Sequence, residues 1–312
     1  MHDVSAAEEK ADREVEAGVN GLDVRRLEDL AVEAARIGGD VLRAAFRDPD
    51  DEDRLEIERK AQNDLVSAAD RASEEAILRH LFDAAPDSRA LAEEGGLLGA
   101  EGERDFAADW SGIEWIVDPL DGTTNFLEGL PIWSVSIAAR EVVAGEPGRL
   151  LAGVVFEPMA DRCFSASFGQ GLRRDGRDIA GLPDKPPSDA FLATGFPFRA
   201  HRGIDLYLEC FREVFLSVRA IRRCGSAALD LAYVACGIYD GFFEFRLSAW
   251  DIAAGACLIR ESGGVVTDLD GGEDFLRSGN ILAGRATVHS HLRRIVGSRA
   301  SEARLDQLVD RP

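Results

Sequence analysis

The chain has 312 residues, of which 46% are hydrophobic, so it can bury a large core in one big domain or in two closely joined ones. A formal net charge of −21 argues against binding of nucleic acid or anionic lipid through a basic surface. No apolar stretch is long enough to span a bilayer, no secretory signal is apparent, and the five cysteines are scattered, so we expect a cytoplasmic protein.

The first half of the chain predicts an acidic tail, two helices and then a strand-rich region. Residues 1–22 are polar and acidic and form the predicted tail. Hydrophobic periodicity and turn residues divide the region that follows. The predicted helices are 23–46 and about 68–83, and the predicted strands are 55–61, 89–93, 114–118, 132–140, 151–157 and 162–168. The last two strands flank a short turn-forming segment, which predicts a hairpin.

The second half of the chain alternates more regularly, and strand–helix alternation implies sheets whose faces are covered by helices. The predicted strands are 190–194, 219–223, 240–246, 264–268 and 280–284, and the predicted helices are 203–217, 226–237, 250–262 and about 287–297. Residues 179–188 carry three prolines and predict the linker between the halves. We therefore divide the chain into an acidic tail (1–22), an N-terminal α+β subdomain (23–185) and a C-terminal α/β subdomain (186–312).

The densest chemical signal is the run 114–126. An apolar strand leads into Asp118, a proline ends the strand pairing, and Asp121 is followed by the small and capping residues of a helix start. Two carboxylates three residues apart can converge on such a turn, and Mg²⁺ prefers oxygen ligands, including backbone carbonyls. The backbone N–H groups of residues 122–124 can face an anion such as a phosphate. Metal-binding carboxylates beside phosphate-binding N–H groups are the components of a site that hydrolyses phosphate esters. The Asp-Pro-x-Asp-Gly turn alone is equally compatible with an ordinary helix cap.

Three further motifs stand in the same order as in a known family. They are Asp64-Leu65-Val66-Ser67 after Lys60, the pair Glu93-Glu94, and Trp250-Asp251-Ile252-Ala253-Ala254-Gly255 followed by Glu261-Ser262-Gly263-Gly264. With all four motifs, residues 23–300 resemble the inositol monophosphatase family of Mg²⁺-dependent, lithium-sensitive phosphatases. The resemblance implies an α/β protein with a layered α/β/α/β/α sandwich, two or three Mg²⁺ ions and a homodimer.

The resemblance also implies a role for each matching residue. Metal ligands are expected at the side chains of Glu93, Asp118, Asp121 and Asp251 and at the carbonyl oxygen of Leu120. Thr123, with Asp64 behind it, matches the pair that helps to activate the attacking water, and Glu93 is expected to share in catalysis. The expected substrate contacts are Gly122, Thr123, Thr124, Ala227 and Glu244. Glu244 would bind polyol hydroxyls, and the alternative is an outward residue on an alternating strand.

Other residues receive predictions of less consequence. Glu94 is expected beside the metal ligands or in solvent, and Asp70 either near the metal or on the helix surface. Asp230 is expected on a helix or at the surface, and all five histidines are expected at the surface. Gly95-Gly96 replaces the small polar residue that is usual in the family, so we expect a looser loop there.

The favoured reaction is Mg²⁺-dependent hydrolysis of a small phosphate monoester by a metal-activated water, with myo-inositol 1-phosphate giving inositol and phosphate. Histidinol phosphate and fructose 1,6-bisphosphate stay open as alternative substrates within the family. 3′-Phosphoadenosine 5′-phosphate is disfavoured, because Thr124-Asn125 stands where the nucleotide phosphatases commonly have Lys-Glu. Rivals from other classes are a non-catalytic metal-binding regulatory protein and, with less support, a carboxylate-pair glycosidase. The expected partner is a small phosphorylated polyol, without nucleic acid or membrane.

Overall fold

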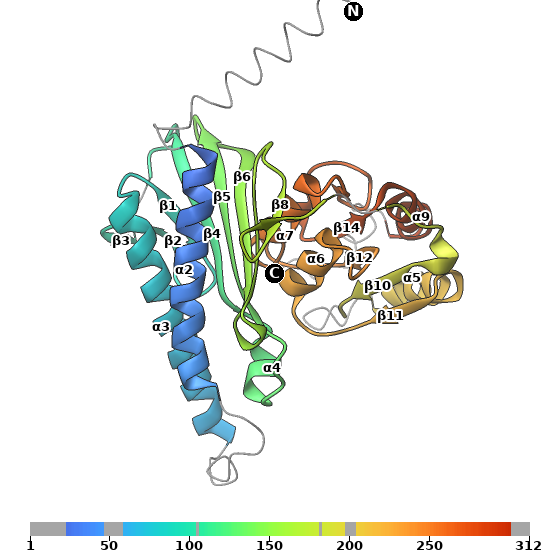
Figure 1. Cartoon of the computed structure of the whole chain (residues 1–312), viewed down its shortest axis with the longest axis horizontal. Coiled ribbons are helices and arrows are strands. Elements are labelled where there is room, and N and C mark those ends of the chain that lie inside the picture. The colour runs from blue at the N-terminus through green and yellow to red at the C-terminus, as the bar shows by residue number, and fades with distance from the viewer. Residues whose placement is uncertain (1–22, 47–58, 104–105, 181–182, 197–203, 301–312) are drawn as a thin grey trace, which may run out of the picture.

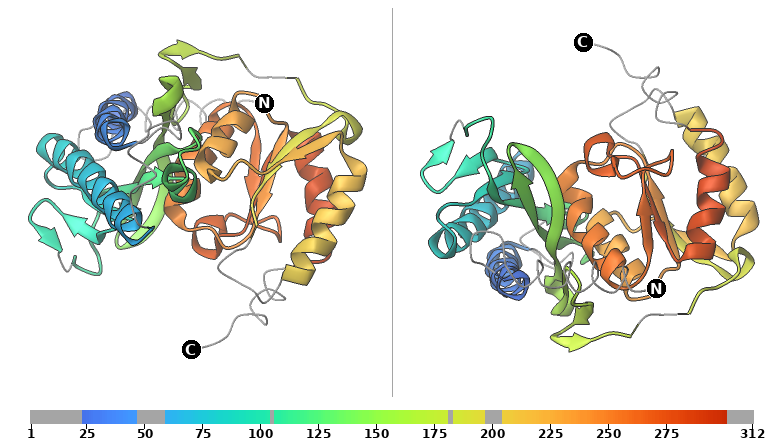
Figure 2. Two further views of the ribbon diagram at one scale, coloured as in Figure 1. Left: turned by 90° about the horizontal axis from the view of Figure 1, so that it is seen from below. Right: turned by 90° about the horizontal axis from the view of Figure 1, so that it is seen from above.

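The computed structural model describes residues 23–46, 59–103, 106–180, 183–196 and 204–300, and for 59–67 it describes the backbone alone. These residues form five layers (Figure 1 and Figure 2). A helix pair covers one face of a nine-stranded sheet, two helices lie between this sheet and a five-stranded sheet, and a second pair covers the outer face of the smaller sheet. The predicted α/β/α/β/α sandwich is therefore confirmed. No helix in these ranges combines the length and the apolar character that crossing a membrane requires.

The large sheet is made of consecutive strands of the first half. Its strands are β1 (Arg89–Ala92), β2 (Gly96–Gly99), β3 (Gly102–Glu103), β4 (Gly112–Asp121), β5 (Ser134–Val143), β6 (Glu146–Glu157), β7 (Arg162–Ser167), β8 (Leu172–Arg174) and β9 (Arg177–Asp178). Their order is β3-β2-β1-β4-β5-β6-β7-β8-β9, and β1 and β4 are the one parallel pair among them. The predicted hairpin is confirmed as β6 and β7, which are joined by the short helix η3 (Pro158–Ala160).

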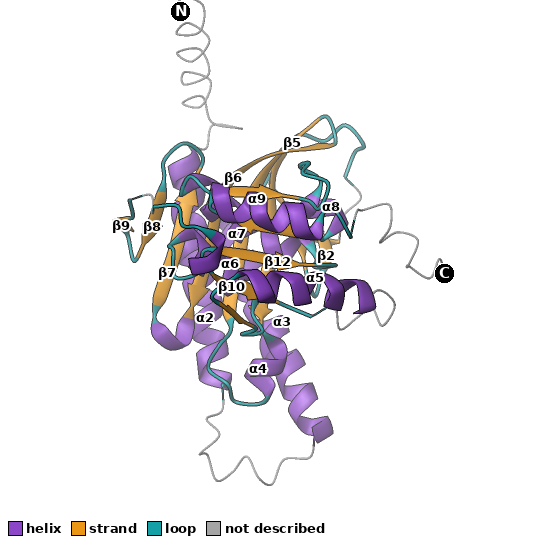
Figure 3. Ribbon diagram, turned by 90° about the vertical axis from the view of Figure 1, so that its right-hand side faces the viewer, coloured by secondary structure: helices purple, strands orange, loops and turns teal. Residues whose placement is uncertain are grey.

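The small sheet belongs to the second half. Its strands are β10 (Phe191–Thr194), β11 (Ala220–Arg222), β12 (Gly241–Glu244), β13 (Val265–Thr267) and β14 (Ile281–Gly284), in the order β11-β10-β12-β14-β13. The helices α6 (Ala227–Ala235) and α7 (Ala249–Glu261) lie between the two sheets. The outer layer consists of α5 (Ile204–Ser217) and α9 (Ala286–Val296), which face the viewer in Figure 3. The segments η4 (Pro187–Asp189) and α8 (Phe275–Ser278) are short connections.

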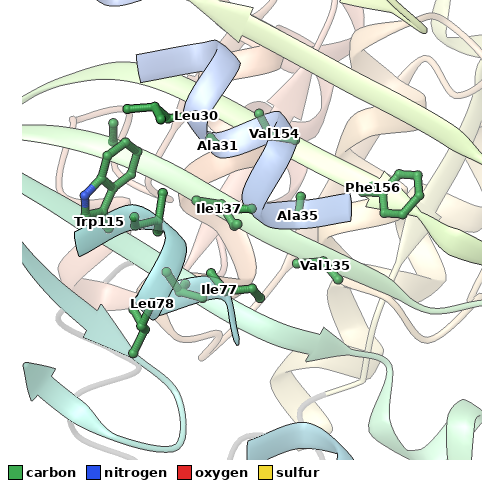
Figure 4. Packing of buried hydrophobic residues seen from close by; sticks show 14 of the residues in the cluster. Leu30, Ala31, Ala35, Ile77, Leu78, Trp115, Val135, Ile137, Val154 and Phe156 are labelled. Atoms are coloured by element: carbon green, nitrogen blue, oxygen red, sulfur yellow. The ribbon is translucent and has the colours of Figure 1, made fainter. Parts of the chain in front are cut away.

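The helices α2 (Val24–Ala45) and α3 (Arg59–Ala84) cover the outer face of the large sheet. The buried side of α2 carries small residues, so the helix packs closely against its neighbours. A Cβ on Gly38 would lie 2.5 Å from Ile77 in α3, and one on Gly39 would lie 2.6 Å from Phe156 in β6. Figure 4 shows the apolar side chains of this layer, among them Leu30, Ala31, Trp115 and Val154.

One predicted element is wrong. Residues 59–61 belong to α3 rather than to a strand, and 55–58 lie outside the described residues. A few alternating residues do not distinguish a strand from the first turn of a helix. Here the helix is long, and Ile77 and Leu81 further along it are fully buried in the apolar layer. The packing of that later part favours helix over the whole segment.

The buried face of α2 carries one charged side chain. Glu28 is 1% exposed and accepts hydrogen bonds from the hydroxyls of Ser165, at 2.8 Å, and Ser167, at 2.6 Å, both in β7. Arg25 forms an ion pair with the same carboxylate at 2.8 Å. A buried carboxylate is stable only with such partners, so these contacts join α2 to the sheet.

Removing this carboxylate should destabilise the protein. We expect Glu28→Ala to lower the free energy of unfolding by about 3 kcal/mol, because two buried hydroxyls lose their acceptor. Urea unfolding followed by circular dichroism measures the loss. Asp29→Ala, at an exposed position of the same helix, is the control and should stay within about 0.5 kcal/mol of the wild type. An equal loss in both variants would assign the effect to the helix rather than to the buried carboxylate.

Candidate active site

The sharp turn between β4 and α4 (Thr123–Leu127) depends on Gly122. The φ of this residue is 101°, in the left-handed region, and a Cβ on it would lie 3.1 Å from Ile132 O. A side chain would therefore meet both strain and crowding, which explains the glycine. The helix start predicted from the sequence is confirmed, and residues 122–124 line a cleft.

Three carboxylates meet at this turn. Asp118 and Asp121 come from the end of β4, and Asp251 comes from the first turn of α7. Each offers an oxygen, and the three oxygens lie within 4.8 Å of one another. The position of Asp251 follows from a capping box, in which Ser248 N donates a hydrogen bond to Asp251 Oδ2 at 2.7 Å. The fold thus brings together two motifs that are far apart in the sequence.

Glu93 joins this cleft through the pairing of β1 with β4. Ala92 lies opposite Val117 in the parallel pair, so Glu93 and Asp118, which follow them, lie side by side just beyond the end of β1. Glu93 N donates a hydrogen bond to Val117 O at 3.1 Å. Glu93 lines the cleft together with the three aspartates.

The carboxylates in the cleft raise one another's pKa values. Burial, together with the charges of Glu93, Asp121 and Asp251, raises the pKa of Asp118 well above its ordinary value. Burial and the charge of Asp251 raise the pKa of Asp121 to about 7, although Ser226 Oγ donates a hydrogen bond to its carboxylate at 2.6 Å. A divalent cation would remove this repulsion, and a donor set made only of oxygen fits Mg²⁺.

The turn itself is held by its own hydrogen bonds. Thr123 Oγ1 donates to Leu120 O at 3.2 Å, and Leu120 N donates to Asp118 Oδ1 at 2.9 Å. Leu120 lines the same cleft as the carboxylates that the resemblance groups with it. Asp64 falls within α3, but its side chain is outside the described residues. The pairing of Thr123 with Asp64 stays a prediction.

The opposite wall of the cleft comes from the second half of the chain. The cleft has a volume of about 300 Å³, and both Ala227 and Glu244 line it. Burial and the negative charges of Asp230 and Asp251 raise the pKa of Glu244 well above its ordinary value. Glu244 therefore lines the cleft and is not an outward-facing residue of an alternating strand.

Two acids lie nearer to the cleft than expected. Asp230 in α6 is 2% exposed and lines the cleft, so its surface alternative is wrong. Asp70 in α3 is 4% exposed, and burial with the charges of Glu94 and Glu93 raises its pKa to about 8, so its helix-surface alternative is wrong as well. The available signal was a lone acid among small or apolar residues of a helix. The surface prediction for His289 is also wrong, because this residue is buried.

The loop after Glu93 is hydrogen-bonded to α3. Glu74 in α3 is buried, and its Oε2 accepts a hydrogen bond from Glu94 N at 3.0 Å. A Cβ on Gly95 would lie 2.8 Å from Glu74 Oε1. The missing side chain of Gly95 therefore leaves room for a glutamate that binds the loop, and the expected looser loop stays a prediction. The side chain of Glu94 itself is exposed.

Two polar residues for which the sequence predicted no structural role connect the two halves of the site. Asn125 Nδ2 donates hydrogen bonds to Ile132 O at 2.7 Å and to Cys224 O at 2.8 Å. Ser226 caps α6 and donates to the Asp121 carboxylate. Both are common residue types at turns and caps, and only the fold reveals their distant partners.

The chain resembles known proteins over most of its length. The model of the inositol monophosphatase family matches residues 23–301. The chain is 42% identical over 274 residues to Nus factor SuhB of Pseudomonas aeruginosa, which covers 85% of this chain and 96% of that protein. It is 41% identical over 270 residues to inositol-1-monophosphatase of Mesorhizobium japonicum, which covers 86% and 95%. The solved structure of inositol monophosphatase from Anabaena sp. PCC 7120 is 34% identical, covers 88% of this chain and 96% of its own, and gives a TM-score of 0.70.

Proposed function

The chain belongs to the inositol monophosphatase family, and on this premise we propose that it hydrolyses a small phosphate monoester with Mg²⁺, preferring myo-inositol 1-phosphate. The observation that carries the proposal is the convergence of Asp118, Asp121 and Asp251 within 4.8 Å, in a cleft that Glu244 also lines. Clustered carboxylates supply a cation site, and the rest of the cleft can hold the phosphate ester.

In this proposal the acids hold two or three Mg²⁺ ions. The ligands are the side chains of Glu93, Asp118, Asp121 and Asp251 and the carbonyl oxygen of Leu120. Bound Mg²⁺ would supply a water of lowered pKa and offset the charge that develops on the leaving oxygen. Because the carboxylates repel one another at neutral pH, the site is expected to depend on the cation.

The other residues of the cleft act on the substrate and the water. Thr123 orients the attacking water, since its hydroxyl pKa is far too high for a base. The family resemblance implies Asp64 as its partner. The backbone N–H groups of residues 122–124 bind phosphate oxygens. Ala227 lies against the alcohol part of the ester, and Glu244 accepts hydrogen bonds from its hydroxyls.

A panel of phosphate monoesters tests the proposal. Phosphate release is measured with Mg²⁺, and with EDTA as the control, on myo-inositol 1-phosphate, histidinol phosphate, fructose 1,6-bisphosphate and glycerol 2-phosphate. We expect the highest kcat/KM on myo-inositol 1-phosphate. Release from none of them would refute hydrolysis. A preference for histidinol phosphate or fructose 1,6-bisphosphate would support metal-dependent hydrolysis and contradict myo-inositol 1-phosphate as the preferred substrate.

The relatives named Nus factor SuhB favour a second candidate, in which this chain acts as a Nus factor by binding. Its basis is the 42% identity to the Pseudomonas aeruginosa protein across 85% of the chain. A binding role would not need turnover, so it survives a substitution that removes hydrolysis. A strain that carries Asp118→Asn in place of the wild type tests it. If deletion gives a growth defect that this variant does not share, binding explains the defect.

Glu244→Ala should reduce the discrimination between substrates more than it reduces the rate of hydrolysis. Glu244 is proposed to contact polyol hydroxyls and no metal, and an unpaired partner costs about 1–3 kcal/mol. We expect kcat/KM to fall much more on myo-inositol 1-phosphate than on glycerol 2-phosphate. Glu209→Ala, at an exposed position of α5, is the control. An equal loss on both substrates would make Glu244 a structural residue instead.

Lithium should inhibit the enzyme, and more strongly at high substrate. Li⁺ is a small hard cation, so a cleft lined by carboxylates can bind it in competition with Mg²⁺. Phosphate release is measured against LiCl, with NaCl at the same ionic strength as the control. Identical curves for the two salts would contradict a lithium-sensitive metal arrangement and leave metal-dependent hydrolysis standing.

The remaining proposals concern assembly and location. A homodimer is expected from the family resemblance, and a cytoplasmic location is expected from the scattered cysteines. Sedimentation equilibrium tests the homodimer. The division of the chain near residue 185 also stays a prediction, which limited proteolysis tests.

A further inference from the structure

The parallel strands β10 and β12 end next to each other at the cleft. Thr194 pairs with Phe243 in this register, so the residues that follow them, Gly195 and Glu244, lie side by side. Paired residues of neighbouring strands place their side chains on the same face of a sheet. A side chain at position 195 would therefore compete with Glu244 for the same space.

The nearest atoms to such a side chain all belong to one group. A Cβ on Gly195 would collide with the carboxyl group of Glu244, whose Oε1, Cδ and Oε2 are the three nearest atoms. The backbone of Gly195 is not in the left-handed region, so an alanine there would carry no conformational strain. The carboxyl group is the far end of a flexible side chain, and the cleft beside it has a volume of about 300 Å³. An alanine would thus move Glu244 and leave the strand in place.

The strand behind the two residues is buried and held by side-chain hydrogen bonds. Thr194 Oγ1 donates a hydrogen bond to Phe243 O at 2.6 Å and is hydrogen-bonded to Tyr207 OH at 2.9 Å. All three residues are buried. A displaced Glu244 carboxyl group therefore cannot move back into the sheet, and the open direction is the cleft.

The displaced group would enter a region of negative charge. Asp121, Asp230 and Asp251 already act on Glu244, and Arg223 is the cation that acts on it. A carboxylate moved further into the cleft would occupy space meant for the alcohol part of the ester. It would also lose the orientation in which it can accept hydrogen bonds from that alcohol.

We infer that Gly195 is a positioning residue that determines specificity: its missing side chain leaves the room in which the Glu244 carboxyl group lies flat against the cleft wall. The inference rests on the proposed function, because it takes the ligand of this wall to be a polyol monophosphate with free hydroxyls. Gly195 touches no reacting atom and acts through Glu244 alone. Nothing in the motif pattern marks this glycine, and only the strand register brings it beside Glu244.

A double-mutant cycle tests the inference. The variants are Gly195→Ala, Glu244→Ala and the two combined, and kcat and KM are measured on myo-inositol 1-phosphate and glycerol 2-phosphate with Mg²⁺. We expect Gly195→Ala to raise KM for myo-inositol 1-phosphate about tenfold or more, with a much smaller change in kcat. In the Glu244→Ala background the same substitution should change KM less than about twofold, since positions that act through one group are not additive.

Two further variants separate this effect from a general effect of losing a glycine. Gly272→Ala also places a Cβ near a carboxylate, 2.7 Å from Asp268 Oδ2, but outside the cleft, and should leave discrimination unchanged. Glu244→Asp, which is shorter by one methylene, should restore part of the loss when combined with Gly195→Ala. An equal KM increase with and without Glu244, or an equal increase on both substrates, would overturn the inference.

A crystal structure of Gly195→Ala gives a readout that does not depend on turnover. We expect the Glu244 carboxyl group to be displaced into the cleft, with β10 and β12 unchanged. A Glu244 that keeps its position would overturn the inference even if KM changes. Absence of phosphate release by the wild type would instead refute the proposed function, and the displacement of Glu244 would still be judged from the structure.

Discussion

Asp118→Asn is expected to lower kcat for phosphate release by about a thousandfold or more, while the protein stays folded. Asp118 is 1% exposed and lies among Glu93, Asp121 and Asp251. Asparagine has the same shape and keeps an oxygen for the hydrogen bond from Leu120 N. It removes one negative charge from the group of carboxylates that would hold the cations. A thousandfold loss of kcat corresponds to about 4 kcal/mol of transition-state stabilisation.

Steady-state phosphate release and thermal melting together measure this result. The melting temperature of the metal-free variant should be no lower than that of the wild type, because one of several mutually repelling charges is gone. Asp87→Asn, at an exposed position before β1, is the matched control and should leave both quantities unchanged. Activity of Asp118→Asn within about tenfold of the wild type would refute its place in a metal-dependent mechanism.

The metal-free protein should lose stability as the pH rises, and Mg²⁺ should restore it. The pKa of Asp121 is raised to about 7, that of Asp70 to about 8, and that of Asp118 well above its ordinary value. The folded protein therefore holds protons that the unfolded chain releases near pH 4. Stability from these raised groups is fully present below the unfolded pKa values and is lost as the pH rises through the folded ones.

The expected size is large, because each unit of pKa shift corresponds to about 1.4 kcal/mol and several groups contribute. Mg²⁺ binds the ionised carboxylates in place of protons, so its stabilising effect should be small at pH 6 and several-fold larger at pH 8. Scanning calorimetry in EDTA and in MgCl₂ at both pH values measures this difference.

Ionic strength must be matched with NaCl in these scans, since a net charge of −21 makes screening by any salt stabilising. Asp118→Asn is the informative variant and should reduce the difference in Mg²⁺ effect between the two pH values. An effect of Mg²⁺ at pH 8 that equals the effect of NaCl would show that the acids do not form a cation site.

Local patterns in the sequence predicted most of the helices and strands and the turn that forms one half of the cleft. Hydrophobic periodicity is a local property, and it predicted α2, the β6–β7 hairpin and the strand–helix alternation of the second half. The turn from Asp118 to Thr123 was also predictable, because a proline, a left-handed glycine and capping residues determine its shape within a few residues. The same locality explains the wrong strand prediction at 59–61. The short alternating pattern there is local, whereas the packing of the long helix α3 favours helix over the whole segment.

The resemblance named Asp118, Asp251 and Glu244 as site residues, but only the tertiary structure shows how these distant residues meet in the cleft. Asp251 meets Asp118 because α7 lies between the sheets, and Gly195 meets Glu244 because two parallel strands end in register. The burial of Asp230 and the anchoring of the loop after Glu93 have the same origin. Such contacts depend on sheet register and layer packing, which sum interactions over the whole chain and leave no signal in the neighbouring residues.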